Sequence, residues 1–423
     1  MAGHTGFNLL REYPDYTKRW IGSAVSALGT QVGWIALIWL AMRVSGGAAA
    51  IGTVTLLYLF PQVLVGPIAG TVLDRFSRAR LMAAANFVLA AIFAAIPLVT
   101  IGRGQWHSLM MYGLILLAGL VLPFDTVGSG PLVADIIPSD KLSEANFLSQ
   151  VIWQVAFLVG PGLGGLLVAL TGSRILLLGD AATFMVLAVL MLTIRTGHLG
   201  GGIPTAALWR EAGDGLQFLV RPPALLTLAV FTLLFNFFYG PFEVLLPDLA
   251  RLHFGGPAAL GLLWFCFSAG ALGGALWFSS KQWPFKMAQS FAVIIIVWGV
   301  CAATFAWAGR DLWAACAVLL AGGLVYSPWE ALAVTAVQRL VPRHMQGRAF
   351  GASNVVAAGG MPLGAWLTGI SLPLINPRLV FLVCGLVTIG VGMAAFGSRS
   401  LREFDRPRPD ESAAPPRAGA RPD

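Results

Sequence analysis

The sequence has little charge and few cysteines, and each scarcity excludes a class of protein. Only 11% of its 423 residues are charged, against about 25% in ordinary soluble domains. The four cysteines lie inside apolar runs without metal-ligand spacing, which predicts inert thiols and no metal site. The sequence also lacks a Walker loop, a zinc-ligand set and a nucleophile triad. We therefore expect neither an enzyme nor an ATP-driven pump, and no cofactor.

Long apolar segments are what the sequence has in abundance. Apolar residues make up 57% of the chain, and its mean hydropathy is +0.79. A run of about 20 apolar residues can cross the roughly 30 Å core of a bilayer as a helix. The sequence therefore predicts an all-α integral membrane protein with twelve spans. The predicted spans are 20–42, 48–73, 81–101, 106–130, 143–170, 174–195, 224–247, 258–280, 287–308, 311–338, 349–371 and 378–396.

The basic residues mark the topology of these spans. The net charge is +8, but Lys and Arg are placed between apolar segments and do not cluster as they would on a nucleic-acid-binding face. Twelve spans put both termini on one side, which then holds 21 of the 27 basic residues and leaves six on the other. Because basic loops stay in the cytoplasm, the sequence predicts that both termini are cytoplasmic.

The stretch 66–80, GPIAGTVLDRFSRAR, ends one apolar span and begins the next with a short charged loop. Its polar residues follow Gly70 as Asp74, Arg75, Arg78 and Arg80. A charged turn between two spans must lie in water, and three arginines favour the cytoplasm. This spacing resembles the loop between helices 2 and 3 of major facilitator superfamily transporters. The resemblance implies an inner gate, in which Asp74 and Arg78 hold the two halves together while the cavity faces outward.

An internal repeat predicts that the chain has two similar halves. Residues 116–150 align with residues 319–354 at an offset of 203 to 204 residues with one single-residue gap, which equates spans 4–5 with spans 10–11. Duplicated six-helix halves are typical of transporters that rock about a site at the midplane. The predicted divisions are a six-helix bundle over 1–195, a cytoplasmic linker with an amphipathic helix over 196–222, a second bundle over 223–396 and a disordered cytoplasmic tail over 397–423.

Glycines four residues apart predict where helices pack closely, because small residues let two backbones approach. In the superfamily that the chain resembles, spans 2 and 11, and spans 5 and 8, form the interface between the halves. Span 1 has the same pattern, and some pairs arise by chance among 50 glycines. The pairs in the four interface spans are Gly66 and Gly70, Gly160 and Gly164, Gly270 and Gly274, and Gly360 and Gly364.

Span 5 carries a second motif, Gly160-Pro161-Gly162-Leu163-Gly164-Gly165. It resembles the core of a motif associated with drug/proton antiporters of the superfamily, and its alternative interpretation is a kinked packing helix. Together with Phe124-Asp125, 142–146 and 180–184, it makes the chain similar to the macrolide-efflux and enterobactin-exporter branch. The chain departs from the antiporters in span 4, where their arginine is missing, and in the second copy of the charged loop, which has decayed over 281–286.

Amide side chains inside the predicted spans, several beside aromatic rings, are candidates for a substrate cavity. Rings and amides together suit an amphipathic organic molecule, whereas hydrogen bonding between helices is the alternative role. One set recurs every four residues along span 5 and so forms a polar stripe on one helix face. The candidates are Gln31, Trp34, Asn146, Gln150, Gln154, Asn236 and Phe237.

Four carboxylates inside spans are candidates for proton coupling: Asp125, Asp180, Glu243 and Glu330. Asp125 has the alternative role of neutralising Arg75 or Arg78 at the inner gate. The same alternative applies to Glu330, which lies two positions from the repeat-equivalent of Asp125. Asp180 has a structural alternative. Glu243 is favoured because it lies in the outer half of span 7, after a Tyr-Gly-Pro sequence expected to interrupt the helix; its alternative is a cap at the water boundary.

These observations predict a monomeric multi-pass exporter in the cytoplasmic membrane of a bacterium. By resemblance, it exchanges an amphipathic drug or natural product for protons by alternating access. Its expected partners are that small molecule, protons and the bilayer, and no nucleic acid. The nearest alternative is an uptake symporter, for example for a lysophospholipid or a sugar. A membrane sensor or scaffold that transports nothing is the alternative from a different class.

Overall fold

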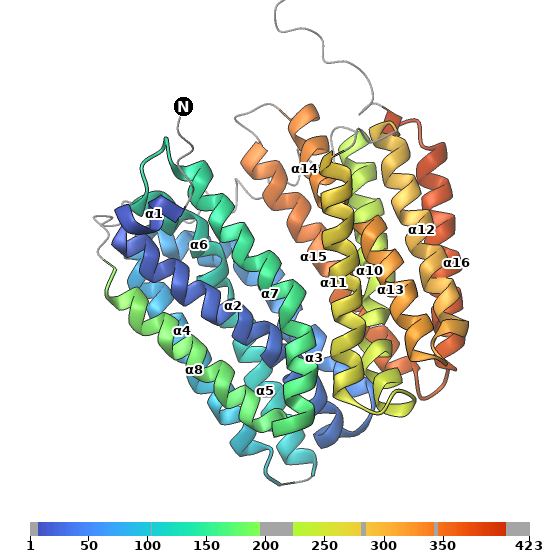
Figure 1. Ribbon diagram of the computed structural model, residues 1–423, viewed down its shortest axis with the longest axis horizontal. Helices are drawn as coiled ribbons and strands as arrows, with labels where there is room; N and C mark the ends of the chain where they lie inside the picture. The colour runs from blue at the N-terminus through green and yellow to red at the C-terminus, as the bar shows by residue number, and fades with distance from the viewer. Residues whose placement is uncertain (1–6, 103, 195–222, 281–284, 342–345, 403–423) are drawn as a thin grey trace, which may run out of the picture.

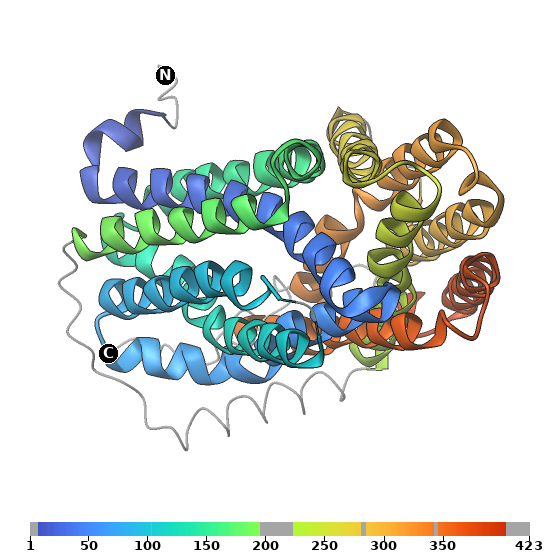
Figure 2. The same cartoon turned by 90° about the horizontal axis from the view of Figure 1, so that it is seen from below.

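The computed structural model describes residues 7–102, 104–194, 223–280, 285–341 and 346–402, and those residues contain helices and no strand (Figure 1). The predicted linker, 196–222, and the predicted tail from residue 403 onward lie outside the described residues. Two groups of helices stand side by side, one from each half of the chain (Figure 2). The fold is therefore the predicted pair of helical bundles.

The first bundle begins with a short helix that sequence analysis did not predict, followed by the first span. Its helices are α1 (Phe7–Glu12), α2 (Pro14–Ala41), the π-helix η1 (Met42–Gly46), α3 (Ala48–Arg75), α4 (Arg78–Val99), α5 (Gln105–Val121), α6 (Pro123–Ile136), α7 (Leu142–Thr171) and α8 (Ser173–Leu192). The second bundle consists of α10 (Pro223–Leu252), α11 (Pro257–Ser280), α12 (Met287–Ala308), α13 (Leu312–Tyr326), α14 (Trp329–Leu340), α15 (Gln346–Ser371) and α16 (Pro377–Gly397).

These helices follow the order of the twelve predicted spans. Within the described residues, ten helical segments are long and apolar enough to cross a bilayer. The α13–α14 pair and the 26-residue α15 occupy the remaining two predicted spans. The largest differences at span ends are six residues. One is in α2, which begins at Pro14 and so carries Lys18 and Arg19 inside the helix, and the other is in α6, which ends at Ile136.

Span 4 runs as one helical span from Gln105 to Ile136 that a turn divides into α5 and α6, and a turn likewise divides span 10 into α13 and α14. In span 4 the turn falls at Leu122, whose N–H bonds the carbonyl of Ala118 at 2.9 Å, and Pro123 then begins α6. In span 10 the turn falls at Ser327 and Pro328, between α13 and α14. A proline has no N–H to continue the helical hydrogen bonds. Both turns lie in the repeated segments, so the two bundles share this feature.

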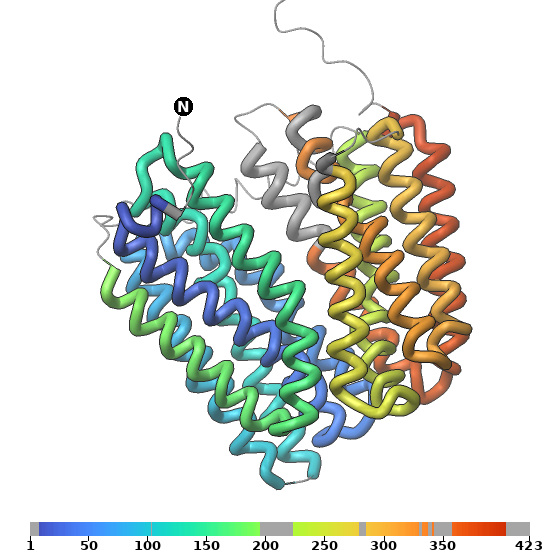
Figure 3. Tube along the Cα trace, in the orientation of Figure 1, coloured from blue at the N-terminus to red at the C-terminus, as the bar shows by residue number. Residues whose placement is uncertain are grey.

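The bundles meet along two helix pairs, α3 with α15 and α7 with α11, which we call the inter-bundle interface. This pairing confirms the prediction from spans 2 and 11 and spans 5 and 8. The interface lies where α3 and α11 begin and where α7 and α15 end, away from the chain end marked N (Figures 1 and 3). There the hydroxyl of Ser268 on α11 donates to the carbonyl of Phe157 on α7 at 3.1 Å.

The predicted glycine pairs do not make this interface, so that part of the prediction is wrong. A Cβ at Gly164 would lie 3.1 Å from the Cα of Val32 on α2, inside the first bundle. Gly270 and Gly274 pack on α13, and Gly360 and Gly364 on α10, while a Cβ at Gly66 would have nothing within 4 Å. The pattern marks close packing within a bundle as readily as between bundles.

Other glycines provide the close approach between the bundles. A Cβ at Gly165 would lie 2.7 Å from the Cα of Gly261, and one at Gly52 would lie 2.6 Å from the carbonyl oxygen of Ala365. Gly369 faces Gly52 in turn, with a Cβ-to-Cα distance of 3.2 Å. No side chain fits at these points without moving a backbone. Of the predicted span-5 motif, Gly165 lies at the interface, whereas Gly160 and Gly164 contact α2.

Candidate functional site

The polar stripe of α7, consisting of Asn146, Gln150 and Gln154, continues the helix face that forms the inter-bundle interface. The Pro161 carbonyl marks this face, because it would lie 2.7 Å from a Cβ at Gly261 on α11. At about 100° per residue, Gln150 and Gln154 lie within about 20° of Pro161 around the helix. All three stripe residues are exposed. The side of α7 that faces the second bundle therefore changes from close backbone contact to accessible amides.

An aromatic pair lies where the interface ends and the stripe begins. The ring of Phe157 lies 6.5 Å from that of Phe267 on α11 in an edge-on arrangement, and 37% of Phe157 is exposed. Phe157 comes three residues after Gln154, so it is close to the stripe on the helix surface. Aromatic and amide groups thus adjoin at the edge of the inter-bundle interface, as an amphipathic ligand requires.

Trp34 and Glu243 link the two bundles. The Trp34 indole, on α2, lies close to the carboxyl group of Glu243, on α10, and the Trp34 ring lies 5.4 Å from that of Tyr58 on α3. Glu243 is 7% exposed, so it does not cap the helix at a water boundary. The prediction that α10 is interrupted before Glu243 is wrong, because α10 runs unbroken through Pro241 and Pro247.

The other predicted cavity residues do not join this group. Gln31 is half-buried against α7. A Cβ added at Gly160 of α7 would collide with the Gln31 Cβ. Asn236 and Phe237 face α15 inside the second bundle, where a Cβ at Gly360 would lie 3.2 Å from the Asn236 Cβ. Phe237 lines a mainly apolar cavity of about 410 Å³ between α10, α15 and α16. The predicted set is therefore divided among four places.

The charged loop forms an ion-pair cluster within the first bundle. Arg78 donates to Asp74 at 2.6 Å and to both carboxylate oxygens of Asp135, on α6, at 2.8 and 2.9 Å. Gly70 also lies over α6, because a Cβ added at Gly70 would lie 3.6 Å from a methyl carbon of Val127. Sequence analysis missed Asp135 because the predicted span 4 ended at residue 130, whereas α6 continues to Ile136.

Asp125 does not pair with Arg78, whose partners are Asp74 and Asp135, so this part of its alternative role is wrong. Its carboxylate accepts a hydrogen bond from Asn86, on α4, at 2.7 Å. The nearby cation is Arg19, which is 2% exposed, interacts electrostatically with Asp125 and donates to Ser129 and Ser149. Sequence analysis had placed Arg19 in the polar segment before span 1. Arg19 follows Asp15 by four residues, a spacing that places two charged residues on one face of a helix. This spacing was the available signal that Arg19 belongs to α2.

Asp180 is buried in the first bundle against two glycines of α2. Its side chain is 2% exposed, one carboxylate oxygen accepts from Thr183 at 3.3 Å, and the other has no partner among the described residues. A Cβ at Gly33 would lie 2.7 Å from the Asp180 Cγ, and one at Gly29 would lie 3.0 Å from a carboxylate oxygen. The glycine pair of span 1 therefore accommodates this carboxyl group. The side chain of Glu330, the fourth candidate, lies outside what the structure describes.

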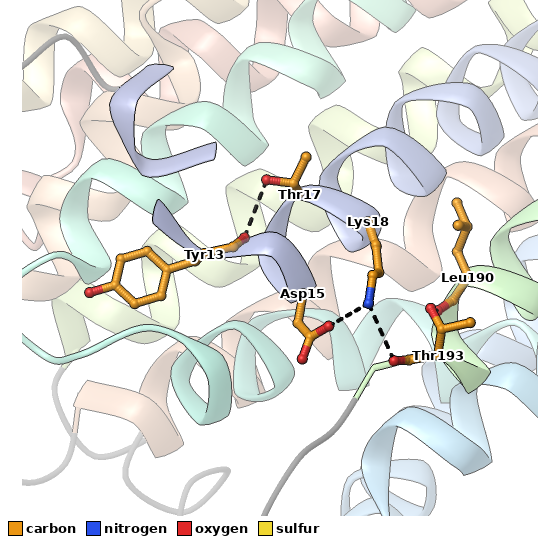
Figure 4. Close-up of polar contacts among 6 residues, drawn as sticks. All are labelled: Tyr13, Asp15, Thr17, Lys18, Leu190 and Thr193. Carbon is orange, nitrogen blue, oxygen red and sulfur yellow. Dashed lines mark hydrogen bonds and ion pairs between the residues drawn. The ribbon is translucent and has the colours of Figure 1, made fainter. Parts of the chain in front are cut away.

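Polar contacts near the N-terminus fasten α1 and α2 to their neighbours. Lys18 donates to Asp15 at 2.7 Å and to the Thr193 carbonyl at the end of α8 (Figure 4). Lys141, before α7, donates to the Glu12 carboxylate at 2.6 and 2.7 Å, and this hydrogen bond raises the pKa of Lys141. The start of α2 is thus tied to the end of α8, and the start of α7 to α1, while the described contacts between the bundles lie farther from the N-terminus.

Twelve apolar spans in two bundles, with accessible amides on a helix face between them, define a membrane transporter of the two-bundle class. Residues 19–365 match the family model described as Major Facilitator Superfamily. Because that match covers most of the chain, the protein belongs to the major facilitator superfamily.

The chain is similar to proteins of this family along almost its whole length. It is 28% identical to multidrug efflux pump Tap of Mycobacterium tuberculosis over 397 residues, which cover 90% of this chain and 92% of Tap. It is 20% identical to macrolide efflux protein A of Streptococcus pyogenes, covering 91% and 96%. The crystal structure of peptide transporter POT in complex with alafosfalin superposes with a TM-score of 0.74 at 13% identity, covering 93% and 95%. That structure supports the fold alone.

Proposed function

We propose that this protein is a secondary active exporter, which moves an amphipathic small molecule out of a bacterial cell in exchange for protons. Two relatives that align with about nine-tenths of the chain are named as a multidrug efflux pump and a macrolide efflux protein. The observation that carries the proposal is the single face of α7 on which the polar stripe follows the inter-bundle interface. Opening that interface would extend the accessible face beyond Phe157, as alternating access requires.

The proposed orientation places both termini in the cytoplasm. The 21 basic residues on the terminal side support it. In this orientation the inter-bundle interface is on the outer side, and the polar stripe is reached from the cytoplasm. The conformation is then the one in which an exporter takes up its substrate.

Glu243 is the proposed coupling residue. It is buried, and the Trp34 indole that lies close to it belongs to the opposite bundle. Separating the bundles would remove that neighbour and admit water, so the charge state of Glu243 is coupled to the opening of the outer side. Asp125 and Asp180 have partners only within the first bundle among the described residues. They are therefore less suited to sense the separation.

The direction and coupling of transport can be measured in everted membrane vesicles. A drug-susceptibility panel, in an exporter-deficient host with and without the gene, first identifies a substrate. Energised everted vesicles should then accumulate it, and a protonophore should abolish accumulation. Accumulation by right-side-out vesicles would identify an uptake symporter instead, and no flux in either preparation would favour the sensor or scaffold alternative.

Matched variants test the proposed roles of the polar stripe on α7 and of Glu243. Gln154→Leu should change which compounds are exported, whereas Val155→Leu, one position around the helix and 53% exposed, should not. Glu243→Gln should abolish proton-driven efflux but retain substrate exchange. Asp248→Asn is the control, because Asp248 is also 7% exposed on α10 but pairs with Arg251 of its own helix. Parental efflux by Glu243→Gln would exclude Glu243 from coupling.

A further inference from the structure

A second cavity, of about 680 Å³, lies in the first bundle at the end away from the N-terminus. It is surrounded by the ends of α2 and α4, the η1 turn and the junction between α7 and α8. Two guanidinium groups line it, from Arg43 in η1 and Arg174 in α8, and none of its lining residues is acidic. It is separate from the polar stripe and from the charged-loop cluster.

The charges of these two arginines are not neutralised by an ion pair within the described residues, whereas the charge of another arginine at the same end is. Arg251 forms an ion pair with Asp248 at 2.9 Å. Neither Arg43 nor Arg174 has an ion pair within the described residues; Arg174 donates to the Thr100 carbonyl, which leaves its charge uncancelled. Only six basic residues lie on this side of the predicted topology, and two of them converge here. An anion is the species that this arrangement would bind.

The first turn of α8 adds further hydrogen-bond donors to the cavity. Its N-cap is Gly172, with φ of +86°, which has no side chain to satisfy the free N–H groups of this 20-residue helix. Ser173, the first residue of α8, also lines the cavity; it is 4% exposed, and its hydroxyl has no partner among the described residues. A buried hydroxyl without a partner is costly. Together with the helix N-terminus, it would suit a bound anion.

The rim of the cavity is apolar and accessible. Ile101 is 69% exposed and Ile175 is 59% exposed, and both line the cavity. Exposed isoleucines beside paired guanidinium groups at the end of a bilayer-spanning bundle match the boundary between acyl chains and headgroups.

We propose that this cavity binds a phosphate group, held by Arg43, Arg174, the Ser173 hydroxyl and the first N–H groups of α8. The phosphodiester of an anionic phospholipid is the source that the apolar rim favours, and inorganic phosphate presents the same chemistry. The site is distinct from the substrate path, and it does not depend on the direction of transport.

Native mass spectrometry of the detergent-solubilised full chain tests the proposal. The probes are phosphatidylglycerol, diacylglycerol as the phosphate-free lipid, and inorganic phosphate. Arg43→Gln combined with Ser173→Ala should weaken phosphatidylglycerol binding about tenfold or more, since charged hydrogen bonds are lost. Neither replaced side chain forms a hydrogen bond or ion pair within the described residues, so the variant should fold normally. Arg310→Gln removes the same charge at the same end, outside the cavity, and should leave binding unchanged.

The possible results distinguish a lipid phosphate, a soluble phosphate and a proposal that is wrong. Loss of phosphatidylglycerol binding without competition by inorganic phosphate supports a lipid site. Competition by inorganic phosphate, lost in the same variant, supports a soluble phosphate source. Equal binding of diacylglycerol and phosphatidylglycerol, or equal binding of phosphatidylglycerol by the cavity variant and Arg310→Gln, would overturn the proposal.

Discussion

Replacing Gly165 by alanine should open the inter-bundle interface. The added Cβ would lie 2.7 Å from both the Cα and the backbone nitrogen of Gly261, so relief requires α7 and α11 to separate. Gly179→Ala is the control, because a Cβ there has nothing within 4 Å. Both sites are in helices, where alanine gains up to about 1 kcal/mol over glycine. The difference between the two variants therefore isolates the collision at the interface.

The size of the effect follows from the cost of overpacking. An extra methyl in a well-packed contact costs about 1–3 kcal/mol. The collision exists only while these ends are together, so the cost falls on this conformation and not on one in which they are apart. A difference of that size shifts the ratio of the two conformations by roughly 5- to 150-fold.

Cysteine accessibility reports this shift directly. Ser268 is 3% exposed and bonds α7 from α11, so a cysteine there, in a background without the native cysteines, should be shielded from a maleimide. Gly165→Ala should accelerate its labelling, and Gly179→Ala should not. If both variants label at the parental rate, the close backbone contact does not control opening, and the reasoning is wrong.

Three further predictions concern the first bundle. Asp135→Asn should lower stability by about 1.5–3 kcal/mol, measured by denaturant unfolding, because it weakens a charged hydrogen-bond pair with Arg78; an unchanged midpoint would show that the pair is not stabilising. Gly33→Ala should destabilise by about 1–3 kcal/mol through collision with the Asp180 carboxyl group, and Asp180→Ala should relieve that cost in a double-mutant cycle, whereas additive losses would contradict the contact. Lys141→Ala should leave the melting temperature unchanged, since its ion pair is exposed to water.

The sequence predicted the fold well because membrane insertion depends on strong local signals. Apolar length predicted the spans to within about six residues at each end, and the internal repeat predicted the two halves. The errors lie where a single residue changes helix geometry. Pro123 and Pro328 each follow a turn that divides a span into two helices, a detail that hydropathy does not carry. The early start of α2 was missed because its first residues are polar, although Arg19 is buried there.

The candidate site was only partly predictable, because hydropathy does not fix the rotation of a helix. The stripe on α7 was predicted from its four-residue spacing, which is a property of one helix. Grouping it with Asn236 and Phe237 required knowing which faces meet, and those two residues face α15. The glycine pairs failed for the same reason. A sequence shows that two glycines share a face, but not whether its partner is in the same bundle or in the other.

The rotation of α7 resolves what the glycine pattern left open. Gly164 and Gly165 are adjacent, yet about 100° of helix rotation directs one toward Val32 of its own bundle and the other toward Gly261 of the opposite bundle. A helix with close contacts on both faces can move against either neighbour only if one contact opens. The α2 contact is supported by hydrogen bonds from Tyr16 to the Ala145 carbonyl at 2.7 Å and from Trp20 to the Leu148 carbonyl at 3.2 Å, whereas between α7 and α11 the described residues show the Ser268 hydrogen bond. Movement about the α7–α11 contact, with α7 and α2 turning together, therefore requires the fewest broken interactions.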